Sequence, residues 1–267
     1  MNYTKITSLS NQKIKEVLDI KKRKGRDKHV SFLIEGPHLI EMALNSGNKL
    51  NDVLFSTSFE SKEEGQQFLR RLSKHTKSIF KVSEHVMARI SDTETTQGIV
   101  AVSACRALSL EDLRPDATAF IVVVDGVQDP GNLGAIIRTA DAAAADAVIL
   151  LPGTCDAFMQ KTVRSTAGSI FNIPVIHADL QALLQWLNLN KIKLAVTSLD
   201  SERTVFEERL EGPLAIVFGN EAHGVGKKIL NAADLILKVP IYGKAESLNV
   251  AAAAAVCIYE AARQRTK

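Results

Sequence analysis

The stretch FIVVVDGVQDPGNLGAIIRTADA, residues 120–142, decides the fold of the C-terminal part of the chain. It opens with an unbroken apolar run, FIVVV, of the kind that fills a central strand of a parallel sheet. A loop with two glycines, Gly126 and Gly131, follows, and the segment that begins at residue 132, which contains Gly134, predicts a helix. We therefore expect a strand, a glycine-rich loop and a helix in this order.

The same alternation continues to the end of the chain. Further strands are expected at AVILLPG, IPVIHA, KLAVTSLD, LAIVFGNE and LILKVPIYG, between residues 147 and 243. Helices are expected at residues 158–172, 180–190 and 247–265. Strict alternation of strands and helices predicts an α/β domain with a doubly wound parallel sheet.

The first hundred residues predict a second, smaller α/β unit. Its expected strands lie within SFLIEG, NDVLFSTS, SIFKVS and GIVAVSA, with helices between them. The polar segment CRALSLEDLRPDATA, which carries a proline, separates the two parts. We predict an N-terminal domain at 1–106, a linker at 107–118 and a C-terminal domain at 119–267.

The composition is that of an ordinary globular protein. Of 267 residues, 46% are hydrophobic and 24% are charged, and no run of 18 apolar residues occurs. The N-terminus has no apolar segment of the kind found in secretory signals. The three cysteines are widely spaced without a CxxC or CxxH pattern, so we expect neither a disulfide framework nor a metal site. These features favour a cytoplasmic protein.

Positive charge is concentrated at the start of the chain. The net charge is +3, but residues 1–28 carry nine Lys or Arg and three acids, a balance of +6 that leaves −3 for the rest. The densest block, KKRKGRDK at residues 21–28, is a candidate contact for nucleic-acid phosphates. Its predicted binding residues are Lys21, Lys22, Arg23, Lys24, Arg26 and Lys28. A solvated helix end that only aids solubility is the alternative.

The glycines of the opening stretch do not match a nucleotide-binding loop. Their positions, Gly126, Gly131 and Gly134, break the G-x-G-x-x-G spacing of dinucleotide-binding folds. Asn132 stands where a phosphate-binding loop requires Lys. This spacing counts against an NAD-dependent oxidoreductase. We interpret the segment as a turn in which Asn132 caps the helix that carries Arg138.

Two further loops share this character. VFGNEAHGVG, residues 217–226, and VPIYGKAESLNVAAAAAV, residues 239–256, also leave the carboxyl ends of expected strands. Ligands of open α/β sheets bind outside these ends, so the three loops are expected to converge on one crevice. The polar side chains available there are Asn132, Arg138, Asn220, Glu221, Ser247 and Asn249. Helix caps and solvated surface positions are the alternatives for each.

Taken together, the three loops resemble the SpoU (TrmH) family of RNA ribose methyltransferases in the SPOUT superfamily. DPGNLGAIIRTA, FGNEAHGVG and VPIYGKAESLNVAAAAAVCIYEAAR are similar to its three motifs, in the same order, across about residues 120–265. The N-terminal part resembles the substrate-binding domain found ahead of such domains, a small ribosomal-protein-like α/β fold. That second resemblance rests on the layout and on FLIEGPHLIEMAL.

The resemblance implies properties that the sequence pattern does not. It implies a trefoil-knotted C-terminal sheet, where the pattern alone predicts an unknotted one. It also implies an S-adenosylmethionine pocket in the knot, a homodimer with its catalytic cleft at the subunit interface, and methylation of a ribose 2′-oxygen in RNA. The added N-terminal domain favours large-subunit (23S) ribosomal RNA as substrate. A transfer-RNA methyltransferase and a non-catalytic RNA-binding or ribosome-assembly protein are the alternatives.

The resemblance also assigns roles to residues. The catalytic group that it implies consists of Asn132, Arg138, Glu221, Ser247 and Asn249. The donor-binding group consists of Thr197, Gly219, Val239, Ile241 and Leu248. The family assigns activation of the 2′-hydroxyl to the position of Arg138. Because an Arg side chain is normally protonated, we favour a cation that binds RNA phosphate and stabilises the alkoxide, and the role of base stays open.

Overall fold

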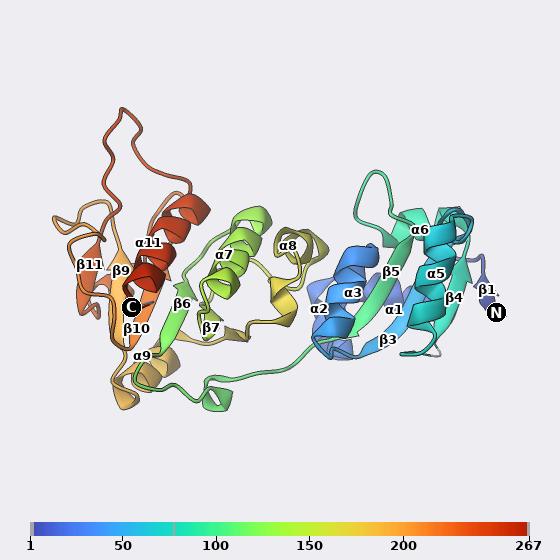
Figure 1. Cartoon of the computed structure of the whole chain (residues 1–267), viewed down its shortest axis with the longest axis horizontal. Coiled ribbons are helices and arrows are strands. Elements are labelled where there is room, and N and C mark those ends of the chain that lie inside the picture. The colour runs from blue at the N-terminus through green and yellow to red at the C-terminus, as the bar shows by residue number, and fades with distance from the viewer. Residues whose placement is uncertain (1–2, 77, 266–267) are drawn as a thin grey trace. The chain divides into compact units, whose positions relative to one another are not determined.

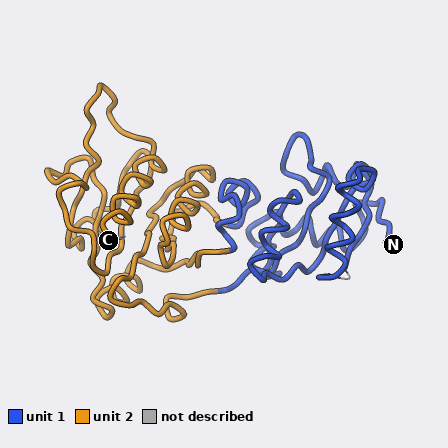
Figure 2. Tube along the Cα trace, viewed as in Figure 1, with its two compact units in different colours: residues 1–107, 158–171 blue, residues 108–157, 172–267 orange. Residues whose placement is uncertain are grey.

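The computed structural model describes residues 3–76 and 78–265, which form two compact units (Figures 1 and 2). Unit 1 comprises Met1–Ala107 and Phe158–Phe171, and unit 2 comprises Leu108–Ala157 and Asn172–Lys267. The expected division placed residues 158–171 in the C-terminal domain, whereas this segment packs within unit 1. The chain therefore passes between the two units three times.

Unit 1 is built on a mixed five-stranded sheet with strand order β1-β4-β3-β5-β2. The strands are β1 (Thr4–Ile6), β2 (Ser31–Glu35), β3 (Leu50–Ser56), β4 (Ile79–Val82) and β5 (Ile99–Ala104). Strands β1, β4 and β3 are parallel, and β5 runs antiparallel to both β3 and β2. The helices are α1 (Gln12–Ile20), α2 (Arg23–His29), α3 (Pro37–Asn45), α4 (Thr57–Glu60), α5 (Glu63–Leu72) and α6 (Glu84–Ile90).

The helices of unit 1 bury apolar stripes on the two faces of this sheet. Ile14 and Val17 of α1 and Met87 of α6 share one apolar cluster with strand residues such as Leu33. Because side chains alternate along a strand, the neighbours of Leu33 face the other side, which α3 and α5 cover. The α/β character predicted for this part of the chain is confirmed.

The segment 158–171 completes unit 1. It contains α8 (Gln160–Ser165) and the short 3₁₀ helix η2 (Ser169–Phe171), so the helix expected over 158–172 is broken near Gly168. Phe158 and Phe171 pack their rings against Phe32 of β2, with centroids 5.0 and 6.0 Å apart. Gly168 has a φ of +99°, and a Cβ there would lie 2.1 Å from the sulfur of Met42. The positive φ favours glycine, and a larger residue would also require the Met42 side chain to move.

Unit 2 contains a six-stranded, fully parallel sheet with strand order β11-β9-β10-β6-β7-β8. Its strands are β6 (Phe120–Val124), β7 (Ala147–Leu150), β8 (Val175–His177), β9 (Lys193–Thr197), β10 (Leu214–Phe218) and β11 (Leu235–Leu237). The FIVVV run is the wholly buried strand β6, with β7 and β10 as its neighbours. The predicted parallel α/β domain is thus confirmed, and the knot stays a prediction.

Helices cover both faces of the sheet of unit 2. They are α7 (Pro130–Ala142), α9 (Leu180–Leu189), α10 (Lys227–Leu230) and α11 (Val250–Arg265), with the 3₁₀ helix η1 at Leu110–Asp112. The N-cap of α7 is Asp129, whose side chain accepts a hydrogen bond from the N–H of Asn132. The prediction that Asn132 caps this helix is therefore wrong. Pro130 at the first helical position leaves the residue before it as the cap.

No helix within residues 3–76 and 78–265 is both long and apolar enough to cross a membrane. The same residues bring no three His, Cys, Asp or Glu side chains together in a group that could hold a metal ion.

Candidate active site at the carboxyl ends of the parallel strands

The loops after β6 and β10 interlock at the carboxyl edge of the sheet of unit 2. The N–H of Asp125 donates to the carbonyl of Phe218 at 2.9 Å, and the Asp125 carboxylate accepts from the N–H of Gly226 at 2.8 Å. The side-chain amide of Asn220 donates to the carbonyl of Gly126 at 2.7 Å. Because β6 and β10 are parallel neighbours, their outgoing loops meet, as the sequence predicts for this edge.

Glu221 fastens the second of these loops to the first. Its carboxylate accepts hydrogen bonds from the N–H groups of Gln128 and Asp129 at 3.1 and 3.2 Å. It also accepts from the Asn132 side-chain amide at 3.0 Å. Burial raises the pKa of Glu221, but the bonds from Asn132 and from the backbone outweigh it, so this pKa lies below its ordinary value. Glu221 thus holds a loop as an anion.

Asn132 connects all three loops. Its amide nitrogen donates to Glu221, and its amide oxygen accepts from the side chain of Asn249 at 3.0 Å. The Asn249 oxygen in turn accepts from the N–H groups of Ala251 and Ala252, at the start of α11. One residue from each loop therefore joins a continuous hydrogen-bonded chain, Glu221–Asn132–Asn249.

A fourth loop, residues 151–157, supports the loop after β6. The Thr154 hydroxyl donates to the carbonyl of Val124 and accepts from the N–H of Gly126, both at 3.0 Å. The N–H of Cys155 donates to the carbonyl of Val127 at 2.8 Å. Sequence reasoning did not identify Thr154, because nothing local distinguishes it from an ordinary loop threonine. The sequence does contain a pattern that indicates Asp129 as the helix cap, namely an Asp directly before a Pro at the start of a helix.

Two of the predicted catalytic residues lie apart from this chain of hydrogen bonds. Arg138 is exposed and, within the described part of the protein, its guanidinium has no hydrogen-bond or ion-pair partner. It follows Asn132 by six residues on α7, which turns its side chain about 120° away around the helix axis. Ser247 is exposed in the loop between β11 and α11.

The predicted donor-binding residues follow three neighbouring strands, β10, β9 and β11. Thr197 ends β9 and donates to the carbonyl of Val217 at 2.8 Å. A Cβ on Gly219 would lie 2.3 Å from the carbonyl carbon of Gly224, so its own loop already requires a glycine there. Val239 and Ile241 are half-buried after β11, and Leu248 is 40% exposed.

The segment 239–248 has features that fit a nucleoside-type ligand. Within the residues that the structure describes, its backbone N–H groups make no hydrogen bond to another backbone carbonyl. Its apolar side chains include Tyr242, which is 90% exposed. Unpaired main-chain donors beside apolar side chains are what small-molecule sites present. The residues present therefore fit S-adenosylmethionine.

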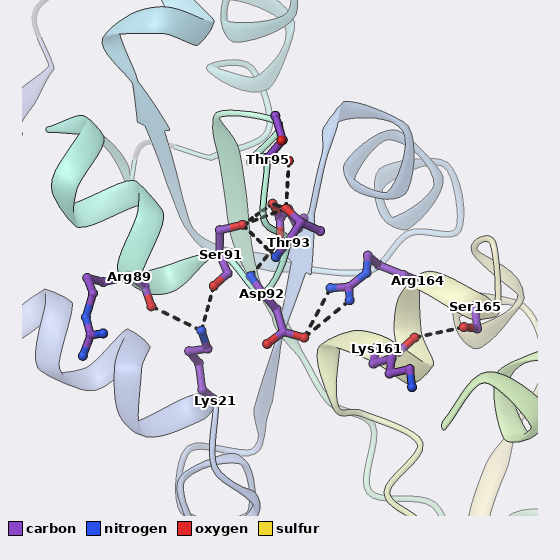
Figure 3. Close-up of polar contacts among 10 residues, drawn as sticks. Lys21, Arg89, Ser91, Asp92, Thr93, Thr95, Lys161, Arg164 and Ser165 are labelled. Atoms are coloured by element: carbon purple, nitrogen blue, oxygen red, sulfur yellow. Dashed lines mark hydrogen bonds and ion pairs between the residues drawn. The ribbon is translucent and has the colours of Figure 1, made fainter. Parts of the chain in front are cut away.

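The basic segment 21–28 lies in unit 1, and only part of it is available for binding. The Arg26 guanidinium is buried and donates to the carbonyls of Ile20 and Lys21, at the end of α1. The Lys21 ammonium donates to the carbonyls of Arg89 and Ser91 (Figure 3). The exposed cations are Lys22, Arg23, Lys24 and Lys28.

Two family models match the chain. The model of the SpoU rRNA Methylase family matches residues 119–259, and that of the MRM3-like substrate binding domain matches residues 11–101. The chain belongs to the SpoU rRNA methylase family. The resemblance predicted from the three loops is confirmed, and with it the enzyme class, an RNA 2′-O-methyltransferase that uses S-adenosylmethionine.

Individual SpoU proteins are similar to this chain over nearly its whole length. The 23S rRNA (guanosine(2553)-2′-O)-methyltransferase RlmP of Bacillus subtilis is 39% identical over 95% of this chain and 97% of its own. The AdoMet-bound rRNA methyltransferase from Sinorhizobium meliloti is 30% identical, covers 99% of both chains and superposes with a TM-score of 0.88. The SpoU methyltransferase AviRb from Streptomyces viridochromogenes, in complex with AdoMet, is 26% identical over 96% and 98%, with a TM-score of 0.86.

Proposed function

We propose that this protein methylates a ribose 2′-hydroxyl of large-subunit ribosomal RNA, as a homodimer in the cytoplasm. The observation that carries the proposal is the hydrogen-bonded chain Glu221–Asn132–Asn249, which ties one residue from each of the three loops. The name of the Bacillus subtilis relative specifies 23S rRNA, and the N-terminal match to a substrate-binding domain supports a large RNA substrate.

The donor, when bound, would supply an electrophilic methyl group: the ribose oxygen bonds to it, the sulfur keeps the electron pair of the broken bond, and the proton of the hydroxyl passes to water. The chain's own contribution is to hold the acceptor ribose in line with that methyl group. In this proposal the backbone of 239–248 and the side chains of Ile241 and Leu248 hold the donor. Correct alignment of two reactants can be worth about 7–11 kcal/mol of barrier.

Arg138 acts as a cation on the RNA. Because arginine side chains are cations in proteins, we assign Arg138 to stabilising negative charge and not to removing the proton of the hydroxyl. An exposed Arg138 that points away from Asn132 and Glu221 supports a cleft completed by a second copy of the chain. In this proposal Ser247, which is exposed in the loop before α11, contacts the ribose in the same cleft.

The test is a single-turnover methylation assay on a 23S rRNA transcript, with transfer RNA as the competing substrate. Arg138→Ala should lower turnover by about two orders of magnitude or more, as removal of a charge-stabilising donor does in other enzymes. Its affinity for S-adenosylhomocysteine should not change. Arg209→Ala is the matched control, because Arg209 is also exposed in unit 2.

Near wild-type turnover of the Arg138→Ala variant would show that Arg138 does not stabilise the reaction. A wild-type protein that binds no S-adenosylhomocysteine would support the non-catalytic alternative instead. Preferred methylation of transfer RNA would overturn the assigned substrate, and a monomer by light scattering would overturn the shared cleft.

A further inference from the structure

The loop at residues 91–97 of unit 1, SDTETTQ, is anchored on a buried carboxyl group. Glu35, at the end of β2, is only 2% exposed. It accepts hydrogen bonds from the hydroxyls of Ser91 and Thr93 at 2.5 and 2.8 Å, and from the N–H of Asp92 at 3.2 Å. Burying a carboxyl group is costly unless hydrogen bonds replace its hydration. These three bonds therefore fix the loop on the end of the sheet.

The basic segment reaches this loop from one direction. The Lys21 ammonium, at the end of α1, donates to the carbonyl of Ser91 at 2.8 Å and to that of Arg89 at 3.2 Å. Arg89 itself lies in the last turn of α6 and is exposed. Lys21 thus ties the start of the basic segment to the 91–97 loop and to the cation beside it.

Helix α8 reaches the same loop with another basic side chain. The Arg164 guanidinium contacts the Asp92 carboxylate at 3.4 Å. Lys161 lies three residues earlier on the same helix, so both side chains project on the same side of it. Lys161 is exposed. In the view of Figure 3, Arg89 and Lys21 lie on one side of Asp92, and Lys161 and Arg164 lie on the other.

The surroundings of the loop suit a polar, anionic partner. Arg89 of α6 and Lys161 of α8 are exposed cations that flank the loop. The loop itself carries the exposed hydroxyl of Thr95. No large exposed apolar side chain occurs in the described segments 84–97 and 160–166. Protein interfaces usually have an apolar core, whereas phosphate contacts come from Lys, Arg and hydroxyl side chains. These features favour RNA over an acidic protein.

We propose that the 91–97 loop, with Arg89 and Lys161, is a docking surface for the phosphate backbone of RNA. It adjoins the basic segment 21–28 through Lys21 and uses a helix, α8, that lies in the methyltransferase part of the sequence. The inference rests on the proposed function, because it names where the substrate docks. A loop fixed beforehand by Glu35 loses less conformational freedom on binding, which favours affinity.

The experiment compares full-length variants in titrations of a 23S rRNA transcript at several salt concentrations. Arg89→Gln with Lys161→Gln removes two cations from the proposed surface. Lys62→Gln with Lys74→Gln, at the two ends of α5, removes two exposed cations elsewhere on unit 1 and is the matched control. Each lost phosphate contact should reduce the slope of log K against log salt by about 0.7–0.9.

We expect the Arg89/Lys161 variant to bind RNA roughly tenfold more weakly at physiological salt, with its slope reduced by about 1.5. Its KM for RNA should rise while single turnover at saturating RNA is retained. Glu94→Gln, which removes an exposed acid from the loop, should change affinity in the opposite direction.

An Arg89/Lys161 variant that binds RNA like the control pair would overturn the docking surface. If the wild-type protein still methylates RNA in that case, the proposed function stands and only this inference fails. Polyglutamate that competes as strongly as RNA of equal charge would assign the surface to an acidic protein instead. A wild-type protein that neither binds S-adenosylhomocysteine nor methylates RNA would overturn the proposed function itself.

Discussion

Glu35 in unit 1 and Glu221 in unit 2 each hold a loop by hydrogen bonds, but the two carboxyl groups differ in their exposure to solvent. Each carboxyl group accepts three hydrogen bonds from a loop at the end of a sheet. Glu35 is almost completely buried and receives two hydroxyls and one N–H, whereas Glu221 is exposed and receives two N–H groups and one side-chain amide. Water can replace the lost partner only at the exposed position. We therefore expect loss of Glu35 to damage the fold and loss of Glu221 to damage mainly the reaction.

The largest effect is expected for Glu221→Ala. It releases the loop that begins at Gln128 and the side chain of Asn132, and misplacing a reacting group by about 1 Å can cost a hundredfold in rate. Single-turnover methylation should fall by about that factor, while thermal unfolding of unit 2 hardly changes. Glu211→Ala, at an exposed position of the same unit, is the control and should retain its rate. Wild-type turnover in the Glu221 variant would contradict the expectation that loss of Glu221 damages the reaction.

A smaller effect, on stability, is expected for Glu35→Ala. It removes the acceptor of the buried Ser91 hydroxyl and of the Asp92 N–H, while the Thr93 hydroxyl can still donate to the carbonyl of Thr95. An unsatisfied buried group costs about 1–3 kcal/mol. Hydrogen exchange of β2 and β5 amides in the intact protein would measure the loss. Glu94→Ala, in the exposed part of the same loop, should stay within about 0.5 kcal/mol of wild type. If both substitutions cost the same, burial does not distinguish the two carboxyl groups.

The smallest effect concerns the thiol of Cys155, which reports on the site around Glu221. Burial raises its pKa to about 11, and the charges of Asp129, Glu221 and Asp156 contribute in the same direction. The thiol therefore stays protonated at neutral pH, and its alkylation by iodoacetamide should accelerate as pH rises toward 11. In a Cys105→Ser background, Glu221→Ala should lower this apparent pKa, and Glu35→Ala should not. A Cys155 that titrates alike in both variants would contradict this assignment.

The sequence was sufficient to predict those parts of the fold that depend on the local pattern of residues. The buried run of β6 and the three polar loops at strand ends follow from hydrophobic pattern and turn residues, and the structure places them as expected. The cap of α7 was misassigned because Asp129 and Asn132 are both good caps. The position of Pro130 decides between them.

Other features depend on contacts between residues distant in sequence. Nothing in KKRKGRDK indicates that Lys21 and Arg26 are bound to backbone carbonyls while Lys22 to Lys24 are exposed. The pattern of 158–172 likewise predicts a helix but not the sheet against which it packs. Glu35 gave no signal, because a single acid at a strand end is ordinary in a sequence and its burial is visible only in three dimensions.

The segment 158–171 limits how the protein can be taken apart or recombined. Cut at the linker, the N-terminal part would lose the rings of Phe158 and Phe171 that cover Phe32, along with the glycine that fits against Met42. The two units are therefore not interchangeable modules. A chimera that exchanges the first hundred residues with those of a relative would have to bring the matching stretch from the middle of the methyltransferase sequence, and the two stretches are expected to change together in evolution.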